Sequence, residues 1–374
     1  MRQAQTLSYT LLTLLTLSIF LGASVIAAAQ PVKVVDSFNR VIDIPEKPTR
    51  IVSLAPSITE TLFAMGLGDR VVGVTSYCNY PPEVLRLVKE GKIEVVGDFI
   101  NPSLEKIVAL KPDLVLAHNL IQDGPEFVKK LEDLGIPVVA IRTPESIEEV
   151  YQVIMLIGKA TWEDEKAADL LASIITEIQR WRNELKDLSP IEVAYVVSYG
   201  PIWVAGSGTY VDDLISLAGG RNVFSDKNWW TSISDEELIQ KDPTVIIISD
   251  EQVYESLKQL KDRDLLHGEL KLVDPDPISR PGPRITHALE ELVKAIHPDI
   301  WSKVVESKEV KTYDENLMLQ VNNIASEISD ISSEIRGSIH ALRSLILVIL
   351  IASVAALASA AAALWITVKR GGRS

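Results

Sequence analysis

An internal repeat is the feature that most constrains how this chain can fold. Residues 103–116 can be placed over residues 234–247, an offset of 131 residues. Each copy has a serine suited to a helix N-cap, a glutamate in the first helical turn (Glu105 and Glu236), a proline and an apolar strand. An aromatic residue also stands six positions before each glutamate. These shared features predict two related halves, which we expect to face each other across a cleft.

Apolar segments of strand length alternate with helical patterns through most of the chain. Residues 146–187 differ, because they contain no proline and form a long helical pattern that only Gly158 interrupts. Strands that alternate with helices are typical of parallel sheets covered on both faces. We therefore expect an α/β fold of two doubly wound parallel-sheet lobes joined by a long rigid helix. The expected strands are 50–55, 71–75, 94–97, 114–117, 137–141, 192–198, 202–205, 245–249 and 271–273.

Two local signals frame the first expected helix. Ser57 and Glu60 have the spacing of a capping box, in which each side chain bonds a backbone amide of the other residue. Gly66 then provides a helix stop, because glycine readily adopts the left-handed conformation. The pattern predicts a helix from Ser57 to about Met65.

Each end of the chain contains an uncharged apolar block. Residues 1–29 combine an apolar stretch with Ala27 to Ala29, which predicts a cleaved signal peptide, with an uncleaved anchor as the alternative. Residues 345–368 carry no charge and are long enough to cross a bilayer as a helix. Basic residues follow directly, so the positive-inside rule predicts a cytoplasmic C-terminus. The expected localisation is the cell membrane, single-pass, with the binding domain on the extracytoplasmic face.

These patterns together predict the domain organisation. Isoleucines at helical spacing before the last apolar block indicate a helical stalk. The expected parts are a signal peptide (1–29), an N-terminal α/β lobe (31–145), connecting helices (146–189), a C-terminal α/β lobe (190–302), a linker and stalk (303–344), a transmembrane anchor (345–368) and a cytoplasmic tail (369–374).

Composition and motifs exclude several classes of function. The formal net charge of −14 argues against a nucleic-acid partner, which requires clustered Lys and Arg. The single cysteine, Cys78, allows neither an intrachain disulfide nor a cysteine-rich metal site. Phosphate-binding, zinc-protease and serine-hydrolase motifs are missing from the sequence. We therefore expect a protein that is not an enzyme, without catalytic residues, a metal site or a cofactor.

Aromatic residues follow several of the expected strands. Tyr77, Phe99, Trp203 and Trp230 fall in turns after strands, where parallel sheets hold their ligands. Rigid aromatic faces stack on flat molecules with little loss of entropy. The sequence therefore predicts an aromatic-lined cleft for a small-molecule ligand, whereas the adjacent Trp229 is expected to cap the core.

Three motifs in order resemble one known family. SLAPSITE (53–60), GVTSYCNYPP (73–82) and NPSLEKIVALKPDLV (101–115) are similar to the class III, helical-backbone substrate-binding proteins of cobalamin and iron-siderophore ABC importers. The resemblance covers about residues 50–301, and YxxYPP most resembles the cobalamin-binding branch. It implies two lobes joined by a rigid helix, a ligand in the cleft, and delivery to a permease dimer with its ATPase.

The resemblance also implies roles for individual residues. Tyr77 and Phe99 match cleft aromatics of the first lobe, and Trp203 and Trp230 match those of the second. Arg280 matches a polar cleft residue. His118 stands where the best-known cobalamin binder has a tryptophan, and it can cover the corrin, contact a siderophore or face solvent. Glu105 and Glu236 match the glutamates that dock on permease arginines.

Three functions follow in order of preference. The first is a membrane-tethered receptor that captures cobalamin or a related corrinoid and delivers it to an ABC importer. The second is the same fold binding a ferric siderophore or haem. The third is an adhesion or sensory ectodomain carried on the stalk.

Overall fold

The N-terminal half of the molecule is built on a five-stranded parallel sheet. Its order is β5-β4-β3-β6-β7, and each neighbouring pair is parallel. The central strands β3 and β6 are buried and apolar except for their last residues, Ser53 and His118, as expected for a sheet covered on both faces. The elements are β3 (Ile51–Ser53), α2 (Pro56–Ala64), the 3₁₀ turn η1 (Gly68–Arg70), β4 (Val71–Val74), α3 (Pro82–Lys89), β5 (Glu94–Val95), α4 (Leu104–Ala109), β6 (Leu114–His118), α5 (Gly124–Asp133) and β7 (Val138–Ile141).

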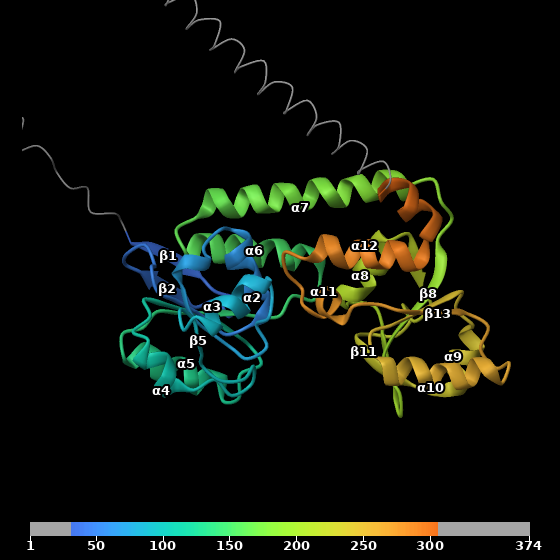
Figure 1. Cartoon of the computed structure of the whole chain (residues 1–374), viewed down its shortest axis with the longest axis horizontal. Helices are drawn as coiled ribbons and strands as arrows, with labels where there is room; N and C mark the ends of the chain where they lie inside the picture. Colours follow the sequence, from blue (N-terminus) through green and yellow to red (C-terminus); the bar gives the residue numbers. More distant parts are fainter. Residues whose placement is uncertain (1–30, 306–374) are drawn as a thin grey trace, which may run out of the picture. The chain divides into compact units, whose positions relative to one another are not determined.

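The C-terminal half is built on a six-stranded mixed sheet. Its main order is β11-β9-β8-β12-β13, and β10 pairs with β8. The elements are β8 (Ile191–Ser198), β9 (Ile202–Ala205), α8 (Tyr210–Leu217), β10 (Gly220–Asn222), β11 (Trp230–Ile233), α9 (Asp235–Lys241), β12 (Val245–Ile248), α10 (Glu251–Asp262), β13 (Glu269–Leu272), α11 (Pro275–Ser279) and α12 (Ile285–Ile296). The computed structural model describes residues 31–305 (Figure 1).

The α/β class with parallel sheets is confirmed, although the second sheet departs from a purely parallel one. β9 is antiparallel to both β8 and β11. Only residues 199–201 separate β8 from β9. A parallel crossover needs a dozen or more residues, so such a short connection can form only a hairpin.

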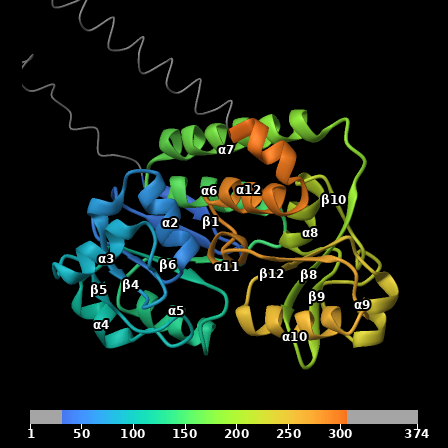
Figure 2. The same ribbon diagram turned by 45° about the vertical axis from the view of Figure 1, so that its right-hand side comes forward.

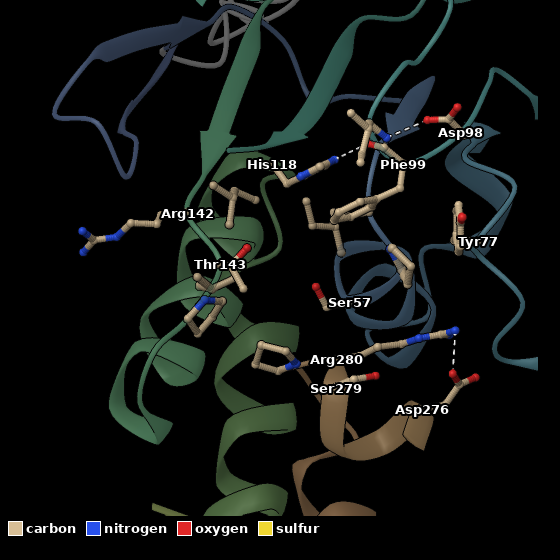
Figure 3. A pocket seen from close by; sticks show the side chains of 18 of the residues that line it. Ser57, Tyr77, Asp98, Phe99, His118, Arg142, Thr143, Asp276, Ser279 and Arg280 are labelled. Carbon is tan, nitrogen blue, oxygen red and sulfur yellow. Dashed lines mark hydrogen bonds and ion pairs between the residues drawn. The ribbon is translucent and has the colours of Figure 1, made fainter. Parts of the chain in front are cut away.

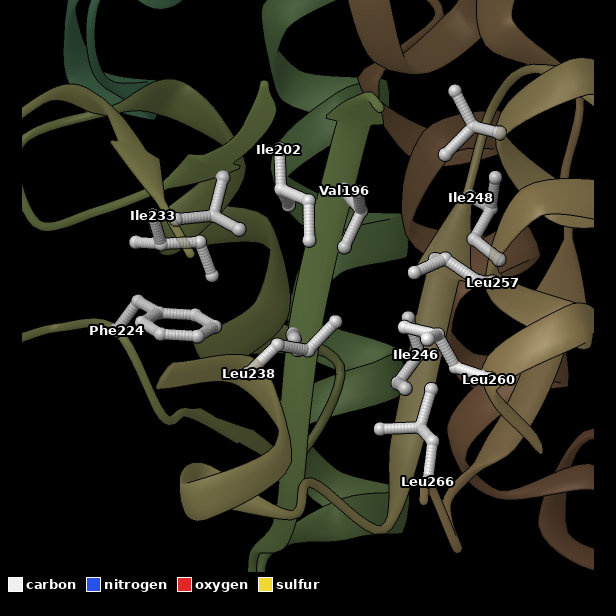
Figure 4. Packing of buried hydrophobic residues seen from close by; sticks show 13 residues of the cluster. Val196, Ile202, Phe224, Ile233, Leu238, Ile246, Ile248, Leu257, Leu260 and Leu266 are labelled. Carbon is white, nitrogen blue, oxygen red and sulfur yellow. The ribbon is translucent and has the colours of Figure 1, made fainter. Parts of the chain in front are cut away.

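An apolar core holds the second sheet against its helices. Phe224 is fully buried and packs with Leu238 and Ile233 in the cluster drawn in Figure 4. Ile246 and Ile248 of β12 face Leu257 and Leu260 of the neighbouring helix in the same view. Burial of these apolar side chains is the main contribution to the stability of the C-terminal half.

The internal repeat is visible in the element boundaries. α4 and α9, β6 and β12, and β7 and β13 each begin 131 residues apart. Ser103 and Ser234 cap their helices, accepting hydrogen bonds from backbone amides at 3.3 Å and 3.2 Å. Lys111 and Asp242, also 131 apart, both leave the helix in the left-handed conformation. The two halves therefore repeat one helix–strand unit down to its helix ends.

The single long connecting helix is not confirmed. The stretch consists of two helices that pack on each other, α6 (Ile147–Ala160) and α7 (Asp164–Leu185). The chain turns at Trp162, whose φ is +61°, and the amide of Glu163 bonds the carbonyl of Gly158 at 2.8 Å. α7 also contacts α12, and the three helices lie along one side of the molecule (Figures 1 and 2).

Two further local expectations differ from the structure. α2 begins at Pro56, and no side chain caps it, so the capping box is wrong. Glu60 instead lies in the helix interior and is 2% exposed. Gly66 does follow the helix with a φ of +68°. An antiparallel hairpin of β1 (Val32–Val35) and β2 (Val41–Ile44) precedes the first sheet and was not expected.

Several expected segments lie outside the described residues. These are the signal peptide, the anchor, the cytoplasmic tail and, beyond residue 305, the linker and stalk. Within residues 31–305, none of the helices has the length and apolar character needed to span a membrane.

The packing of α6 on α7 gives the first prediction. A Cβ on Gly158 would lie 2.3 Å from the Cβ of Ala167, too close for two carbon atoms. Gly158→Ala should therefore lower the free energy of unfolding by about 1–3 kcal/mol, the usual effect of overpacking. Chemical denaturation followed by circular dichroism measures the change.

The matched control is Gly124→Ala in the first turn of α5, where an added Cβ meets open space. That change should leave stability equal or raise it by up to about 1 kcal/mol, because alanine restricts the unfolded chain. Equal stability of the two variants would show that α6 and α7 do not pack at Gly158.

Candidate functional site

A cavity of about 580 Å³ lies at the carboxyl ends of the strands of the first sheet. This is the edge at which open parallel sheets bind ligands, because the connections there leave a crevice. Its lining includes Ser57, Tyr77, Phe99, His118, Asp276 and Arg280 (Figure 3). Residues 276–281 come from the C-terminal half, so the cavity has a wall from each half.

Phe99 and His118 form a stacked pair in this cavity. Their ring centroids are 3.8 Å apart with an interplanar angle of 11°, and Tyr77 meets Phe99 edge-on at 6.4 Å. Tyr77 is 58% exposed, so its ring is available to a ligand. Three aromatic rings, two from loops and one from the end of β6, therefore form one surface (Figure 3).

Hydrogen bonds fix the tautomer of His118. The amide of Leu120 donates to Nδ1 at 3.1 Å, so Nε2 carries the proton and donates to the carbonyl of Phe99 at 2.7 Å. Burial lowers the pKa of His118, and the imidazole is neutral at neutral pH. With both nitrogens engaged, His118 positions Phe99 and offers no free nitrogen to a metal.

Arg280 is held by side chains from both halves. Its guanidinium bonds Asn79 at 2.6 Å, Asp276 at 2.8 Å and Glu60 at 3.3 Å. In Figure 3 the side chain extends toward Asp276. The expected ligand residue thus reaches the cavity with its charge already compensated, and it favours a neutral polar ligand group over a carboxylate.

Our sequence analysis did not predict the buried ion pair behind Arg280. Glu60 accepts two bonds from Arg284, at 2.8 Å and 2.7 Å, and both residues are buried. The guanidinium of Arg284 also lies 4.1 Å from the ring centre of Tyr80. Glutamate within an apolar helical stretch was the signal for this contact, since such a charge requires a partner.

A second cavity of about 400 Å³ continues the first into the C-terminal half. The two share lining residues, including Thr143 and Pro281, so they form one cleft. Trp230 lines the second cavity and meets Tyr195 edge-on at 6.3 Å. Burial raises the pKa of Tyr195 to about 12, which keeps its hydroxyl neutral. The cleft is therefore lined with aromatic rings at both ends.

Two tryptophans are placed differently from what the sequence indicated. Trp229, expected to cap the core, is 44% exposed and lines the second cavity. Trp203 lines neither of these two cavities. It is 39% exposed because β9 alternates at this point, with Ile202 and Val204 on the buried face.

The two glutamates of the repeat lie apart from the cleft. Glu105 and Glu236 occupy the first turns of α4 and α9 and are exposed. Backbone and Ser234 hydrogen bonds lower the pKa of Glu236. Both views place α4 and α9 in different halves, on the side away from α7 (Figures 1 and 2).

Residues 51–268 match the family model of the periplasmic binding proteins. The chain belongs to this family. Its cleft, formed at the strand ends of two α/β halves, corresponds to the fold that the sequence motifs resemble.

Individual relatives cover most of their own length. An uncharacterized ABC transporter substrate-binding lipoprotein, YvrC of Bacillus subtilis, is 35% identical over 73% of this chain and 88% of its own. A vitamin B12-binding protein of Vibrio cholerae is 29% identical over 66% of this chain and 89% of its own. The crystal structure of a possible iron-binding periplasmic protein of Staphylococcus epidermidis has a TM-score of 0.60 and 32% identity, over 67% of this chain and 100% of its own.

These relatives settle the general class and correct one expectation. The chain is a substrate-binding protein of an ABC importer, and relatives of this kind bind solutes and are not enzymes. The expected single-pass membrane localisation is contradicted, since the Bacillus subtilis relative is a lipoprotein rather than a membrane-spanning protein. The segment 345–368, on which that expectation depended, lies outside the described residues.

His118 gives a pH prediction with a definite sign. Its pKa is lower in the folded protein than in the unfolded chain, so the unfolded chain binds more protons at acid pH. The stability contribution is therefore complete above the ordinary histidine pKa near 6.5 and is lost as pH falls through the lowered folded pKa. His118→Gln should flatten this part of the profile of unfolding free energy against pH.

The comparison is between the wild type and His118→Gln over the range from about pH 6.5 down to 4. A wild-type slope that survives in His118→Gln would show that His118 is not the group whose protonation opposes folding.

Proposed function

We propose that this substrate-binding protein captures cobalamin or a related corrinoid in the cleft and delivers it to the permease of an ABC importer. The observation that carries the proposal is the continuous cleft with aromatic walls from both halves. Tyr77 and Phe99 stand on one side, and Trp230 stands on the other. A large flat macrocycle fits such a cleft, because its faces and edges meet rigid apolar rings.

The charge at the cleft supports a corrinoid over an acidic ligand. Arg280 is bonded to two carboxylates and an amide, so its remaining capacity suits an amide edge. Corrinoids carry neutral amide groups around the ring. The vitamin B12-binding relative of Vibrio cholerae supports the same ligand.

A ferric siderophore is the second candidate. The Staphylococcus epidermidis relative, described as possibly iron-binding, favours this ligand. Haem is less favoured, because an axial histidine needs a free ring nitrogen and both nitrogens of His118 are engaged.

The test of the ligand is an absorption titration of the purified protein with cobalamin, haemin and a ferric siderophore. Cobalamin should bind with a spectral shift and with quenching of tryptophan fluorescence. Trp230→Ala should weaken binding by about 1–3 kcal/mol, because a buried aromatic anchor contributes that much. Saturable binding of the ferric siderophore alone would replace the corrinoid proposal with the second candidate.

Delivery of the ligand to the permease gives a separate prediction, which concerns Glu105 and Glu236. Two exposed carboxylates at equivalent positions of the repeat are suited to docking a bilobed protein on a two-fold permease, by pairing with its cations. The double variant Glu105→Lys and Glu236→Lys should keep ligand affinity within about twofold and abolish uptake in cells.

The matched control reverses Glu126 and Glu251, which occupy the first turns of α5 and α10. It makes the same change in net charge and should leave uptake near normal. If the Glu105 and Glu236 variant transports at the normal rate, these glutamates serve only their helix termini.

A further inference from the structure

Trp229 has a backbone conformation that tryptophan rarely adopts. Its φ is +64°, in the left-handed region that clashes with a Cβ. The other non-glycine residues with positive φ in residues 31–305 stand at helix ends or in a hairpin turn, where such a conformation is common. They are Asn39, Lys111, Asp123, Trp162, Asp242 and Asp264. Trp229 instead lies in the loop that leads into β11.

Neighbouring backbone holds Trp229 in this conformation. Its amide donates to the carbonyl of Ser207 at 2.8 Å, and its carbonyl accepts from the amide of Gly206 at 2.9 Å. Ser207 also donates twice to the carbonyl of Lys227, through its amide and its hydroxyl, each at 2.8 Å. The loop is therefore fixed on both sides of the strained residue.

Gly206 makes this close approach possible. A Cβ at Gly206 would lie 2.5 Å from the carbonyl oxygen of Lys227 and 2.7 Å from that of Trp229. The loop before β11 thus sits against the end of β9 at a distance that only glycine permits. Gly206 and Trp229 both adopt the backbone geometry that this contact between the loop and the end of β9 requires.

The strained backbone of Trp229 is not explained by packing of its side chain in the core. Trp229 is 44% exposed and lines the cleft, beside the Trp230 ring that meets Tyr195. Strained residues that the surrounding structure holds in place are concentrated at ligand sites. Glycine or asparagine fits the backbone better, so the use of tryptophan points to its indole.

We propose that Trp229 is a ligand-contacting residue, whose indole forms the wall of the cleft in the C-terminal half beside Trp230. The ligand surface that it recognises is the flat or apolar face of a large ring system, on which an indole stacks. The inference rests on the proposed function and adds a residue that neither the repeat nor the motifs indicated.

Two truncations separate the contact from the strain. Trp229→Ala and Trp229→Gly both remove the indole, but only glycine relaxes at a φ of +64°. The glycine variant should therefore melt roughly 2 °C above the alanine variant. Both should lose cobalamin affinity equally, by about tenfold or more. Trp229→Phe, which keeps an aromatic face, should stay within about threefold of the wild type.

Trp162 provides a matched control for these changes. It is also a tryptophan with positive φ, but it follows the C-cap of α6 and lines neither cavity of the cleft. Trp162→Gly should leave cobalamin affinity within about twofold of the wild type. If Trp162→Gly binds normally, neither the loss of a tryptophan nor the relief of backbone strain explains weaker binding by the Trp229 variants.

The outcomes distinguish this inference from the proposed function. Wild-type affinity in both Trp229 truncations, with cobalamin still bound, overturns the contact and leaves the function standing. Affinity that follows melting temperature, with glycine binding better than alanine, also overturns it, because Trp229 would then act through stability. A wild-type protein that leaves cobalamin unbound overturns the proposed function, and the cobalamin contact with it.

Discussion

The cleft depends on one buried ion pair between Glu60 and Arg284. Glu60 belongs to α2 of the N-terminal half, and Arg284 immediately precedes α12 of the C-terminal half. Taking both charges out of water costs several kcal/mol each, so the pair need not stabilise the fold relative to apolar residues. Its two hydrogen bonds do specify a single orientation, because either charge left alone in this place would be strongly unfavourable.

The walls of the cleft are arranged around that pair. Arg280 also bonds Glu60 of α2 and Asn79 of the loop after β4, which holds residues 276–281 against the N-terminal half, and it pairs with Asp276 of its own segment. Ser279 and Pro281 of this segment line both cavities, and so connect the two aromatic walls. This polar network therefore helps to set the distance between the two aromatic walls.

Sequence patterns predicted those parts of the fold that local chemistry decides. The serine caps of α4 and α9, the stop at Gly66 and the strands of the repeat depend on residues within a few positions of each other. The capping box failed because Glu60 is bound by an arginine 224 positions away, which a local pattern cannot indicate. The break between α6 and α7 was missed because propensity alone favours a continuous helix, whereas Gly158 lets α7 fold back on α6.

The sequence indicated which residues line the candidate site better than it indicated the contacts that they make there. Tyr77, Phe99, His118, Arg280 and Trp230 all line the cleft. For Tyr77, Phe99 and His118 the reason is that the carboxyl ends of parallel strands converge at one edge. What each side chain does there depends on its neighbours. His118 supports Phe99 because an amide two residues away fixes its tautomer, and Arg280 is largely neutralised by carboxylates.

Two connections between the halves bear on how the protein selects its ligand. One is covalent, through α6 and α7, and the other is the Glu60–Arg284 pair. Glu60 and Arg284 are both buried, and a displacement that parted them without admitting water would leave two unpaired buried charges, which is strongly unfavourable. The pair therefore opposes small displacements of one half against the other. Selection therefore depends on the fit of the ligand to a cleft that is already formed, and small changes in its aromatic walls act directly on affinity.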